Sequence, residues 1–315
     1  MAVTVASAPA KIILFGEHAV VYGRPAIAVP ISQVRAEAIV EDSLRSGIRL
    51  RAPNLGREYW LNEAPDGDPF ARAVQSVLEF VTLPNLPDLT ITVKSMIPIA
   101  SGLGSGAAMA AAVIRSLALH LEITDLATDE QVSTLCYQVE RLLHGTPSGI
   151  DNTVVAYERP VYFVRQQPTN RIDTFSVAAP LHLLVADTGE ESKTWDVVGD
   201  VRRQWQENPK KFELLFDNCG RMANEARIAI QEGDPERVGR LMHENQGYLR
   251  AMTVSSEKLE RLIAAADSSG ALGAKLSGAG RGGNMIALVE EENEDEVRSS
   301  LLATGANSVL LSVLT

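Results

Sequence analysis

The sequence has few cysteines, no excess of basic residues and no long hydrophobic run. Its two cysteines, Cys136 and Cys219, stand far apart among 315 residues, so they form neither a disulfide framework nor a closely spaced metal site. The formal net charge of −11 leaves no basic field to hold a nucleic acid or an anionic membrane surface. No run reaches the roughly 20 apolar residues of a transmembrane helix. These absences argue against disulfide-rich, nucleic-acid-binding and membrane-spanning proteins.

What remains is the composition of an ordinary globular chain. Hydrophobic residues make up 45% and charged residues 22% of it. The first eleven residues lack the charged segment and apolar core of a signal peptide, which together with reduced cysteines predicts a cytoplasmic protein. The length suits two domains, and we place their boundary so that one covers residues 1–175 and the other 176–315. Neither repeats nor a low-complexity linker interrupt them.

Apolar periodicity predicts alternating strands and helices up to residue 164. Strands are expected at 3–5, 12–15, 26–30, 35–41, 89–93 and 160–164, a polar hairpin at 43–61, and helices at 69–81, 107–121 and 129–144. Residues 7–11 are expected to interrupt the first two strands. Thr128 or Asp129 is the expected N-cap of the third helix and Gly145 its end. Residues 148–156 carry polar groups into the last of these strands.

The pattern changes after a turn at residues 166–170. A buried strand is expected at 181–186, and the chain is then almost entirely helical from 196 to 265, with breaks near 208–209, 233–235 and 252–253. Strands at 273–276, 284–289 and 308–313 and a helix at 292–302 complete the prediction.

The stretch from Pro98 to Met109 is a glycine-rich turn between an expected strand and an alanine-rich helix. Such a turn presents unpaired backbone N–H groups and the positive end of the helix dipole, which suits a phosphate. The alternative is a turn of small residues that lets the helix pack close to a sheet. Glycine content alone does not decide between them.

A second glycine-rich loop covers residues 278–283. It formally matches a dinucleotide-binding fingerprint, but an expected strand follows it where that site needs a helix, so we reject a Rossmann site. A Walker A sequence is also absent. Lys275 and Arg281 flank the loop, which could therefore close over an anion. A tight hairpin that needs positive φ angles is the alternative.

Polar residues border the strand expected at 12–15. Lys11 precedes it, and Glu17 and His18 follow it, at a place where strand ends often present site residues to a cleft. Taken alone, a histidine there is more often a hydrogen-bonded structural residue, and a lysine is usually solvated.

Glu140 and Asp151 form an acidic pair of interest. Glu140 lies late on the helix expected at 129–144, and Asp151 follows a turn-rich segment at 145–149. One carboxylate could hold Mg²⁺ while the other accepts a proton from a hydroxyl. The alternative is a surface glutamate beside Arg141 and an aspartate that caps a turn.

Together these stretches resemble the GHMP small-molecule kinases. The matching motifs are residues 9–23, with the run Gly-Glu-His-Ala-Val-Val-Tyr-Gly, residues 98–108, residues 144–152, and residues 275–280. They occur in the family's order and span nearly the whole chain. The first and third motifs are specific to the branch that acts on mevalonate, whereas the glycine loops are common to the superfamily.

The resemblance implies a two-domain α+β fold. An N-terminal domain like the second domain of ribosomal protein S5 would precede a ferredoxin-like domain, with the active site in the cleft between them. The implied activity is ATP-dependent phosphorylation of the 5-hydroxyl of mevalonate, a step toward isoprenoid precursors, with Mg²⁺. The implied partners are mevalonate and ATP, without nucleic acid or membrane, and a homodimer is left open.

The resemblance also assigns residues. Asp151 matches the catalytic base, Lys11 the lysine that pairs with it, and Glu140 a ligand of Mg²⁺ that Ser105 would assist. The segment that wraps the ATP phosphates corresponds to Pro98, Ala100, Ser101, Gly102, Leu103, Gly104, Ser105, Gly106 and Ala107. The residues expected to hold the substrate are Glu17, His18, Asp151, Thr188, Gly278 and Ala279.

Two positions depart from the family pattern. Gly106 stands where a second serine usually contributes to the metal site, so Ser105 or a water is expected to replace it. Arg281 stands where glycine is usual, and it either reaches a phosphate or points to solvent. The alternatives are a phosphomevalonate kinase, a sugar kinase, and a regulatory nucleotide-binding module without catalysis. An extra basic cluster would favour the phosphomevalonate kinase, and none exists beyond Lys193 and residues 202–203.

Overall fold

The computed structural model describes residues 2–81, 83, 85–98, 102–126, 128–144 and 147–315, without the side chains of 143 and 144. The chain forms two compact units, each built from separate stretches of sequence. Unit 1 comprises Met1–Lys11 and Val34–Glu158, and unit 2 comprises Ile12–Gln33 and Arg159–Thr315. Each unit contains both helices and strands, which confirms the α+β class.

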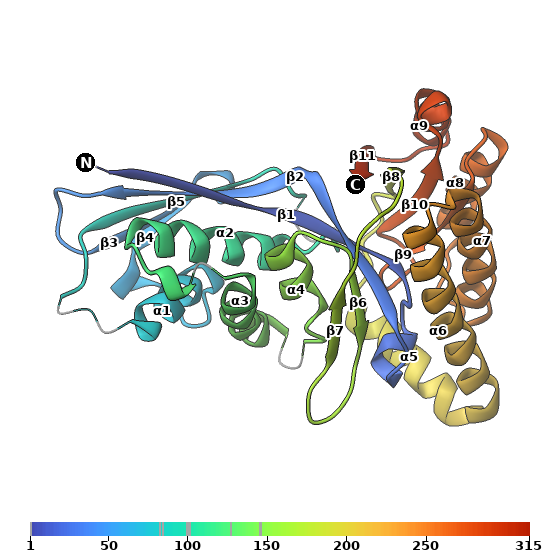
Figure 1. The fold of residues 1–315 in the computed structure, drawn as a ribbon, viewed down its shortest axis with the longest axis horizontal. Coiled ribbons are helices and arrows are strands. Elements are labelled where there is room, and N and C mark those ends of the chain that lie inside the picture. The colour runs from blue at the N-terminus through green and yellow to red at the C-terminus, as the bar shows by residue number, and fades with distance from the viewer. Residues whose placement is uncertain (1, 82, 84, 99–101, 127, 145–146) are drawn as a thin grey trace. The chain divides into compact units, whose positions relative to one another are not determined.

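Unit 1 is a sheet with helices on one face (Figure 1). Its strands are β1 (Val3–Phe15), β2 (Ala26–Asp42), β3 (Ile48–Ala52), β4 (Arg57–Trp60) and β5 (Leu89–Ser95), of which β1 and β2 continue into unit 2. The sheet runs β4-β3-β5-β2, with β3 parallel to β5 and the other pairs antiparallel, and β1 also pairs with β2. Its helices are α1 (Pro69–Phe80), α2 (Ser105–His120), α3 (Asp129–His144) and α4 (Ile150–Tyr157).

Unit 2 contains a four-stranded antiparallel sheet in the order β11-β8-β10-β9. Its strands are β6 (Val161–Val164), β7 (Arg171–Thr174), β8 (Leu181–Asp187), β9 (Gly273–Ser277), β10 (Asn284–Val289) and β11 (Ser308–Leu314). Its helices are α5 (Thr194–Glu207), α6 (Pro209–Glu232), α7 (Pro235–Ala251), α8 (Glu257–Ser268) and α9 (Glu294–Ala303). From β8 onward the chain alternates as strand, helices, strand, strand, helix, strand, and this topology confirms the ferredoxin-like prediction.

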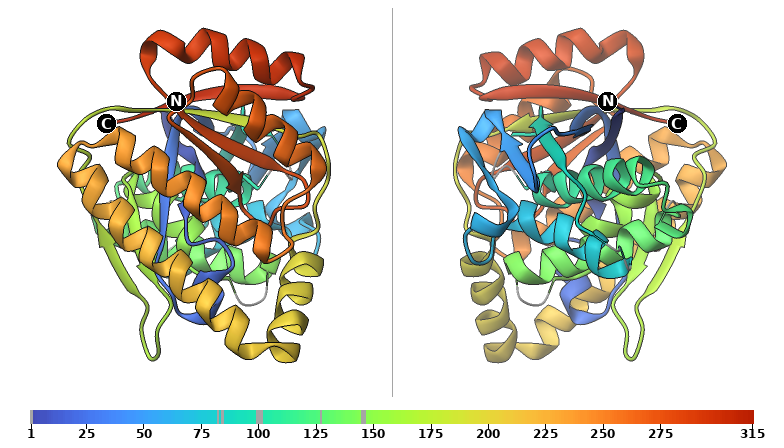
Figure 2. Two further views of the ribbon diagram at one scale, coloured as in Figure 1. Left: turned by 90° about the vertical axis from the view of Figure 1, so that its right-hand side faces the viewer. Right: turned by 90° about the vertical axis from the view of Figure 1, so that its left-hand side faces the viewer.

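The core of unit 2 lies between this sheet and its helices. Helices α7 and α8 pack against β9, and α9 packs against β8 and β11 (Figure 2). Phe212 and Phe216 of α6 are fully buried there, and Tyr22 stacks on Phe216 with ring centroids 4.0 Å apart. Each such buried aromatic contributes roughly 1.5–3 kcal/mol by leaving water. Tyr22 ends the short 3₁₀-helix η1 (Ala19–Tyr22), which therefore holds the segment after β1 in place.

Helix boundaries agree well with the predicted breaks. Helix α5 ends at Glu207, α6 ends at Glu232, and α7 ends at Ala251. The predicted N-cap Thr128 is confirmed, because its Oγ1 accepts a hydrogen bond from the Gln131 N–H at 3.3 Å. Gly145, the predicted end of α3, lies outside the described residues. Other 3₁₀ turns are η2 (Pro53–Leu55), η3 (Leu61–Glu63), η4 (Thr124–Leu126) and η5 (Glu291–Asn293).

The prediction that residues 7–11 interrupt the first strand is wrong, because β1 is continuous. Small buried residues, Ala8 and Ala10, flank Pro9 in this strand. The carbonyl of Ser7 accepts a hydrogen bond from Arg115, and its hydroxyl accepts one from Arg35. Side chains thus satisfy part of the backbone where a proline weakens the ladder.

The predicted strands at 26–30 and 35–41 are likewise one strand, β2. Its first part pairs with β6 through Ala26–Ala28, and its last part pairs with β5 from Ala36 to Asp42. Pro30 lies between the two paired stretches, where the strand changes partner and a missing N–H costs no bond of either ladder.

Two further elements were not predicted. Residues 150–157 form helix α4, and residues 171–174 form strand β7. Helix α4 follows Gly149, whose φ of 91° turns the chain into it, and Asp151 lies in its first turn where a negative charge is favoured. No helix in the described parts of the chain is long and apolar enough to cross a membrane.

Candidate functional site

The glycine-rich stretch leads directly into the N-terminus of α2. Gly104 is the N-cap residue, with φ of 73°, and no side chain among the described residues caps the helix. A Cβ at Gly104 would lie 2.8 Å from Cγ of Lys11, so glycine also allows this lysine to pass closely. The predicted phosphate-loop residues 102–107 surround this helix end. Ala100 and Ser101 lie outside the described residues, whereas Pro98 is described.

Lys11 and Asp151 form an ion pair in unit 1. Their Nζ and Oδ1 atoms are 3.0 Å apart, with the lysine side chain 7% and the aspartate side chain 32% exposed. The backbone N–H of Lys11 donates to the Leu103 carbonyl at 3.0 Å, which ties β1 to the loop before α2. The expectation of a merely solvated lysine is wrong, since Lys11 is buried between the loop and α4.

Glu140 lies on α3 and is only 3% exposed, so the surface alternative is wrong. The pKa of its carboxyl is raised to about 7, mainly by burial and also by the charge of Asp151, while Lys11 opposes the shift. Cys136, one turn earlier on α3, shares these neighbours. Burial raises the pKa of its thiol well above the ordinary value, and Glu140 and Asp151 add to the shift, so this cysteine is inert.

The carboxylate of Glu140 fits a Mg²⁺ ion that is held together with a phosphate ligand. Among the described residues, no three acidic, histidine or cysteine side chains gather as an all-protein metal cage. A single buried carboxylate, Glu140, which senses the charge of Asp151, instead resembles the sparse donor sets in which phosphate and water complete a Mg²⁺ site. The Ser105 hydroxyl belongs to the first residue of α2, in the same unit.

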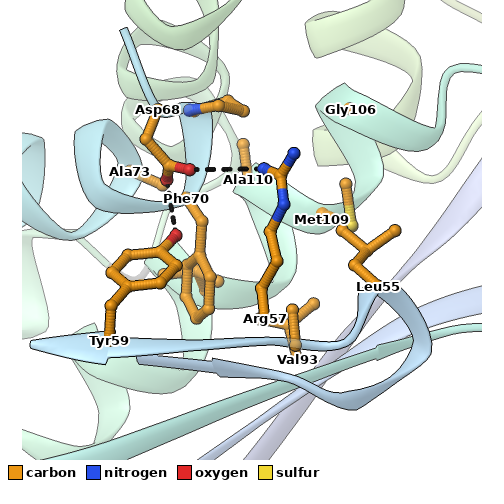
Figure 3. A pocket seen from close by; sticks show the side chains of 13 residues that line it. Leu55, Arg57, Tyr59, Asp68, Phe70, Ala73, Val93, Gly106, Met109 and Ala110 are labelled. Carbon is orange, nitrogen blue, oxygen red and sulfur yellow. Dashed lines mark hydrogen bonds and ion pairs between the residues drawn. The ribbon is translucent and has the colours of Figure 1, made fainter. Parts of the chain in front are cut away.

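A pocket with an empty volume of about 450 Å³ borders the same helix end (Figure 3). Four of its lining residues follow helical spacing on one face of α2: Gly106, Met109, Ala110 and Val113. The opposite wall comes from the hairpin β3–β4, from α1 and from β5: Ala52, Leu55, Arg57, Tyr59, Asp68, Pro69, Phe70, Ala73 and Val93. Most of these side chains are apolar, which suits a flat ring.

One edge of this pocket is polar. The Tyr59 hydroxyl donates to Oδ1 of Asp68 at 2.8 Å, and the Arg57 guanidinium lies 3.7 Å from Oδ2 (Figure 3). Asp68 also caps α1, because its Oδ1 accepts from the Ala71 N–H at 2.8 Å. The pocket thus combines apolar walls with a few fixed polar groups, as small-molecule sites do.

In unit 2, Glu17 is buried against Lys275 of β9. Both side chains are 0% exposed, and Lys275 Nζ also donates to the Leu276 carbonyl at 2.6 Å. Burial raises the pKa of Glu17 and lowers the pKa of Lys275, and each charge opposes the shift of the other. The expectation that Lys275 faces the second glycine loop as an anion ligand is therefore wrong.

His18 bonds to the glycine loop itself. Its Nε2 lies 2.8 Å from the Ala279 carbonyl, so this nitrogen carries the proton. Burial lowers the pKa of His18 to about 4, although the bond to Ala279 opposes the shift, and the ring is neutral at neutral pH. The residue has φ of 59° and starts η1. Two predicted substrate residues are thus in contact.

The loop at 278–283 needs its glycines, as the hairpin alternative predicted. A Cβ at Gly280, whose φ is 82°, would lie 2.0 Å from the Val254 carbonyl oxygen. The predicted residue Thr188 contacts the far end of the loop, where its hydroxyl donates to the Gly283 carbonyl at 2.8 Å. Arg281 pairs with Asp200 and donates to the Thr253 carbonyl. The expected roles of Arg281 were a contact with a phosphate or a position in solvent. Its side chain instead holds the loop to α5 through Asp200.

The sequence did not indicate the pocket in unit 1. Met109 and Val113 read as ordinary positions of an alanine-rich helix, and Phe70 and Ala73 as part of an apolar stripe on α1. The sequence contains the elements that form the walls, namely an amphipathic helix, a polar hairpin and the glycine turn. They enclose a pocket only when β3, β5, α1 and α2 pack together.

Both halves of the chain match known protein families. The family model for the GHMP kinases N terminal domain matches residues 70–159, and that for the GHMP kinases C terminal matches residues 226–307. Because neither match reaches residue 175, the domain boundary predicted there remains a prediction.

Individual mevalonate kinases are similar to this chain over nearly its full length. Mevalonate kinase of Thermococcus sibiricus is 35% identical, and the alignment covers 98% of this chain and 95% of that protein. The structure of the L. major mevalonate kinase in complex with R-mevalonate superposes with a TM-score of 0.86 at 31% identity, covering 100% and 96% of the two chains. The Methanococcus jannaschii mevalonate kinase gives 0.84 at 26%, covering 99% and 98%. The chain therefore belongs to the mevalonate kinase family of the GHMP kinases.

Proposed function

We propose that this chain transfers the terminal phosphoryl group of ATP to the 5-hydroxyl of mevalonate, giving 5-phosphomevalonate and ADP. The observation that carries the proposal is the ion pair of Lys11 and Asp151, 3.0 Å apart, in the same unit as the N-terminus of α2, which no described side chain caps. The names of the full-length relatives support the choice of substrate.

Asp151 is the proposed base. Its carboxylate is partly exposed, so a substrate hydroxyl can reach it, and it needs only to orient that hydroxyl and accept its proton as the oxygen attacks. Lys11, beside it, would lower the pKa of the hydroxyl and stabilise the negative charge that develops on its oxygen. Phosphoryl transfer depends mainly on such positioning and electrostatic stabilisation.

The nucleotide would lie along α2. Its phosphates would accept hydrogen bonds from the N–H groups at the start of the helix, where residues 102–107 turn into it. Its base would enter the pocket that Met109 and Val113 line, whose apolar walls and fixed polar edge are typical of small-molecule sites. The ring would then stack on apolar side chains.

Glu140 and Ser105 are the proposed protein ligands of Mg²⁺. When bound, the ion neutralises charge on the phosphate oxygens. Glu140 is suited to this because a cation beside its buried carboxylate would favour the charged form that binds metal.

The remaining predicted residues would hold mevalonate. His18 bonds to Ala279 and Thr188 bonds to Gly283, so both side chains contact the loop at 278–283, which also carries Gly278. Glu17 supports the segment of His18 from the interior. The neutral imidazole of His18 would act as a hydrogen-bonding group and not as a fixed positive charge.

The direct test is ADP release from Mg-ATP with four acceptors in parallel: mevalonate, 5-phosphomevalonate, galactose and homoserine. We expect turnover with mevalonate alone. Turnover only with another acceptor would keep the chemistry and change the substrate. Binding of ATP without turnover of any acceptor would instead support a regulatory module.

Filling the pocket should weaken nucleotide binding. In Met109→Trp the indole would occupy the space assigned to the base, so we expect the KM for ATP to rise on the order of tenfold with a smaller change for mevalonate. Leu119→Trp is the matched control, because Leu119 is exposed near the other end of α2. An unchanged KM for ATP in a folded Met109→Trp protein would place the base elsewhere.

A further inference from the structure

The ion pair of Glu17 and Lys275 lies entirely inside unit 2. Neither side chain has any exposed surface, so neither is accessible to a ligand in this conformation. Oε1 of Glu17 accepts from Lys275 Nζ, and Oε2 lies 3.5 Å from Nδ2 of Asn245 on α7. Lys275 Nζ donates its second bond to the Leu276 carbonyl. The pair thus joins the end of β1 to β9 and α7.

Two further bonds connect the same segments. The Ser277 hydroxyl donates to the Ile13 carbonyl at 2.7 Å, and His18 Nε2 donates to the Ala279 carbonyl at 2.8 Å. Three contacts thus join the two segments: residue 13 to residue 277, residue 17 to residue 275, and residue 18 to residue 279. The contact of Glu17 with Lys275 is fully buried, and the contact of His18 with Ala279 reaches the glycine loop.

His18 needs support of this kind. Its φ of 59° lies in the left-handed region, which is unfavourable for a residue with a Cβ and persists only where the surroundings fix it. The Ala19 N–H donates to the Glu17 carbonyl at 2.6 Å and the Val20 N–H donates to the Gly16 carbonyl at 3.1 Å. The side chain that anchors this turn to the interior is Glu17.

We propose that Glu17 and Lys275 are positioning residues that fix the backbone of His18 and the loop carrying Ala279 from within, and so set how His18 meets the small acid substrate. The proposal rests on the function proposed above. Stability alone is a poor reason for the pair, because two apolar side chains of similar length would fill the same interior without the cost of burying charge.

The test replaces both charges together. In Glu17→Met/Lys275→Met no unpaired charge remains, so we expect a folded protein with a melting temperature close to that of the parent. We expect kcat/KM for mevalonate to fall on the order of 10- to 100-fold, because the binding group is displaced, while the KM for ATP stays unchanged. Parent-like kinetics with mevalonate would overturn the proposal.

Two additional variants guard against a folding artefact. Glu17→Gln keeps the shape and an acceptor for Lys275 but leaves the charge of Lys275 buried without a counter-ion. It should therefore lower the melting temperature more than the double variant does and yet show a smaller loss in kcat/KM for mevalonate. Leu301→Ala empties part of the unit 2 core at a residue that is 0% exposed, and it should lower the melting temperature without changing the KM for mevalonate. If Leu301→Ala alters that KM as strongly as the double variant, positioning is refuted.

A measurement without catalysis separates this proposal from the proposed function. The Nε2–H proton of His18, assigned by its loss in His18→Gln, should shift in the NMR spectrum of the double variant because its bond to Ala279 changes. A parent that does not phosphorylate mevalonate would refute the function. An unshifted His18 signal would refute the positioning role, whatever the activity.

Discussion

Asp151→Asn is expected to lower kcat for mevalonate phosphorylation by about 10²- to 10⁴-fold, the range for loss of a general base. Asparagine keeps the shape of the side chain and a hydrogen bond to Lys11, but it cannot take the proton of the hydroxyl. The Kd for ATP should stay nearly unchanged, because Asp151 is assigned no contact with the nucleotide. Steady-state kinetics and a separate ATP titration measure the two effects.

Asp125→Asn is the matched control for this substitution, since Asp125 is an exposed aspartate of the same unit. Lys11→Met provides a second comparison. If Lys11 and Asp151 act as one unit at 3.0 Å, the double variant should lose little more than the worse single variant. Turnover close to that of the parent in Asp151→Asn would remove the carboxylate from its assigned role.

Glu140→Gln is expected to have opposite effects on stability and activity. The folded-state pKa of Glu140 is about 7 against an ordinary value of 4.5, so folding favours the protonated form. The parent therefore loses stability as the pH rises from about 4.5 to about 7, and the loss is complete above that range. By the same linkage the cost is about 3 kcal/mol at pH 8, and glutamine does not bear it.

We therefore expect Glu140→Gln to unfold at a higher denaturant concentration than the parent at pH 8 and at a similar one near pH 4. The same variant should need much more Mg²⁺ for half-maximal activity, because a neutral amide is a poorer ligand. Glu130→Gln, at an exposed position of the same helix, is the control. Equal stabilities at pH 8 would mean that burial does not disfavour the charge of Glu140.

The elements that the sequence revealed are those set by local chemistry. Thr128 caps α3 through its own hydroxyl, and the breaks near 208–209 and 233–235 fall at prolines and glycines. The residues that the sequence could not place depend on distant partners. Pro30 interrupts a local strand pattern, yet β2 continues because β6 and β5 pair with it on either side.

The candidate site shows the same division. The motifs identified Lys11, Glu140 and Asp151, but only the packing of α3 and α4 reveals that Glu140 is buried beside a second carboxylate. Nothing near Glu17 in the sequence indicates that its partner is Lys275. The pocket walls come from β3, β4, β5, α1 and α2, and no single segment carries their signal.

The interleaving of the two units bears on how the chain folds during synthesis. Residues 12–33 leave the ribosome early but belong to unit 2, most of which follows residue 159. Glu17 must therefore stay hydrated until Lys275, 258 residues later, has been made. A nascent chain halted near residue 160 would lack most of unit 2 and would therefore expose the apolar end of β1 to chaperones. Residues 12–33 can therefore reach their final packing only after the last quarter of the chain, which includes Lys275, has been synthesised.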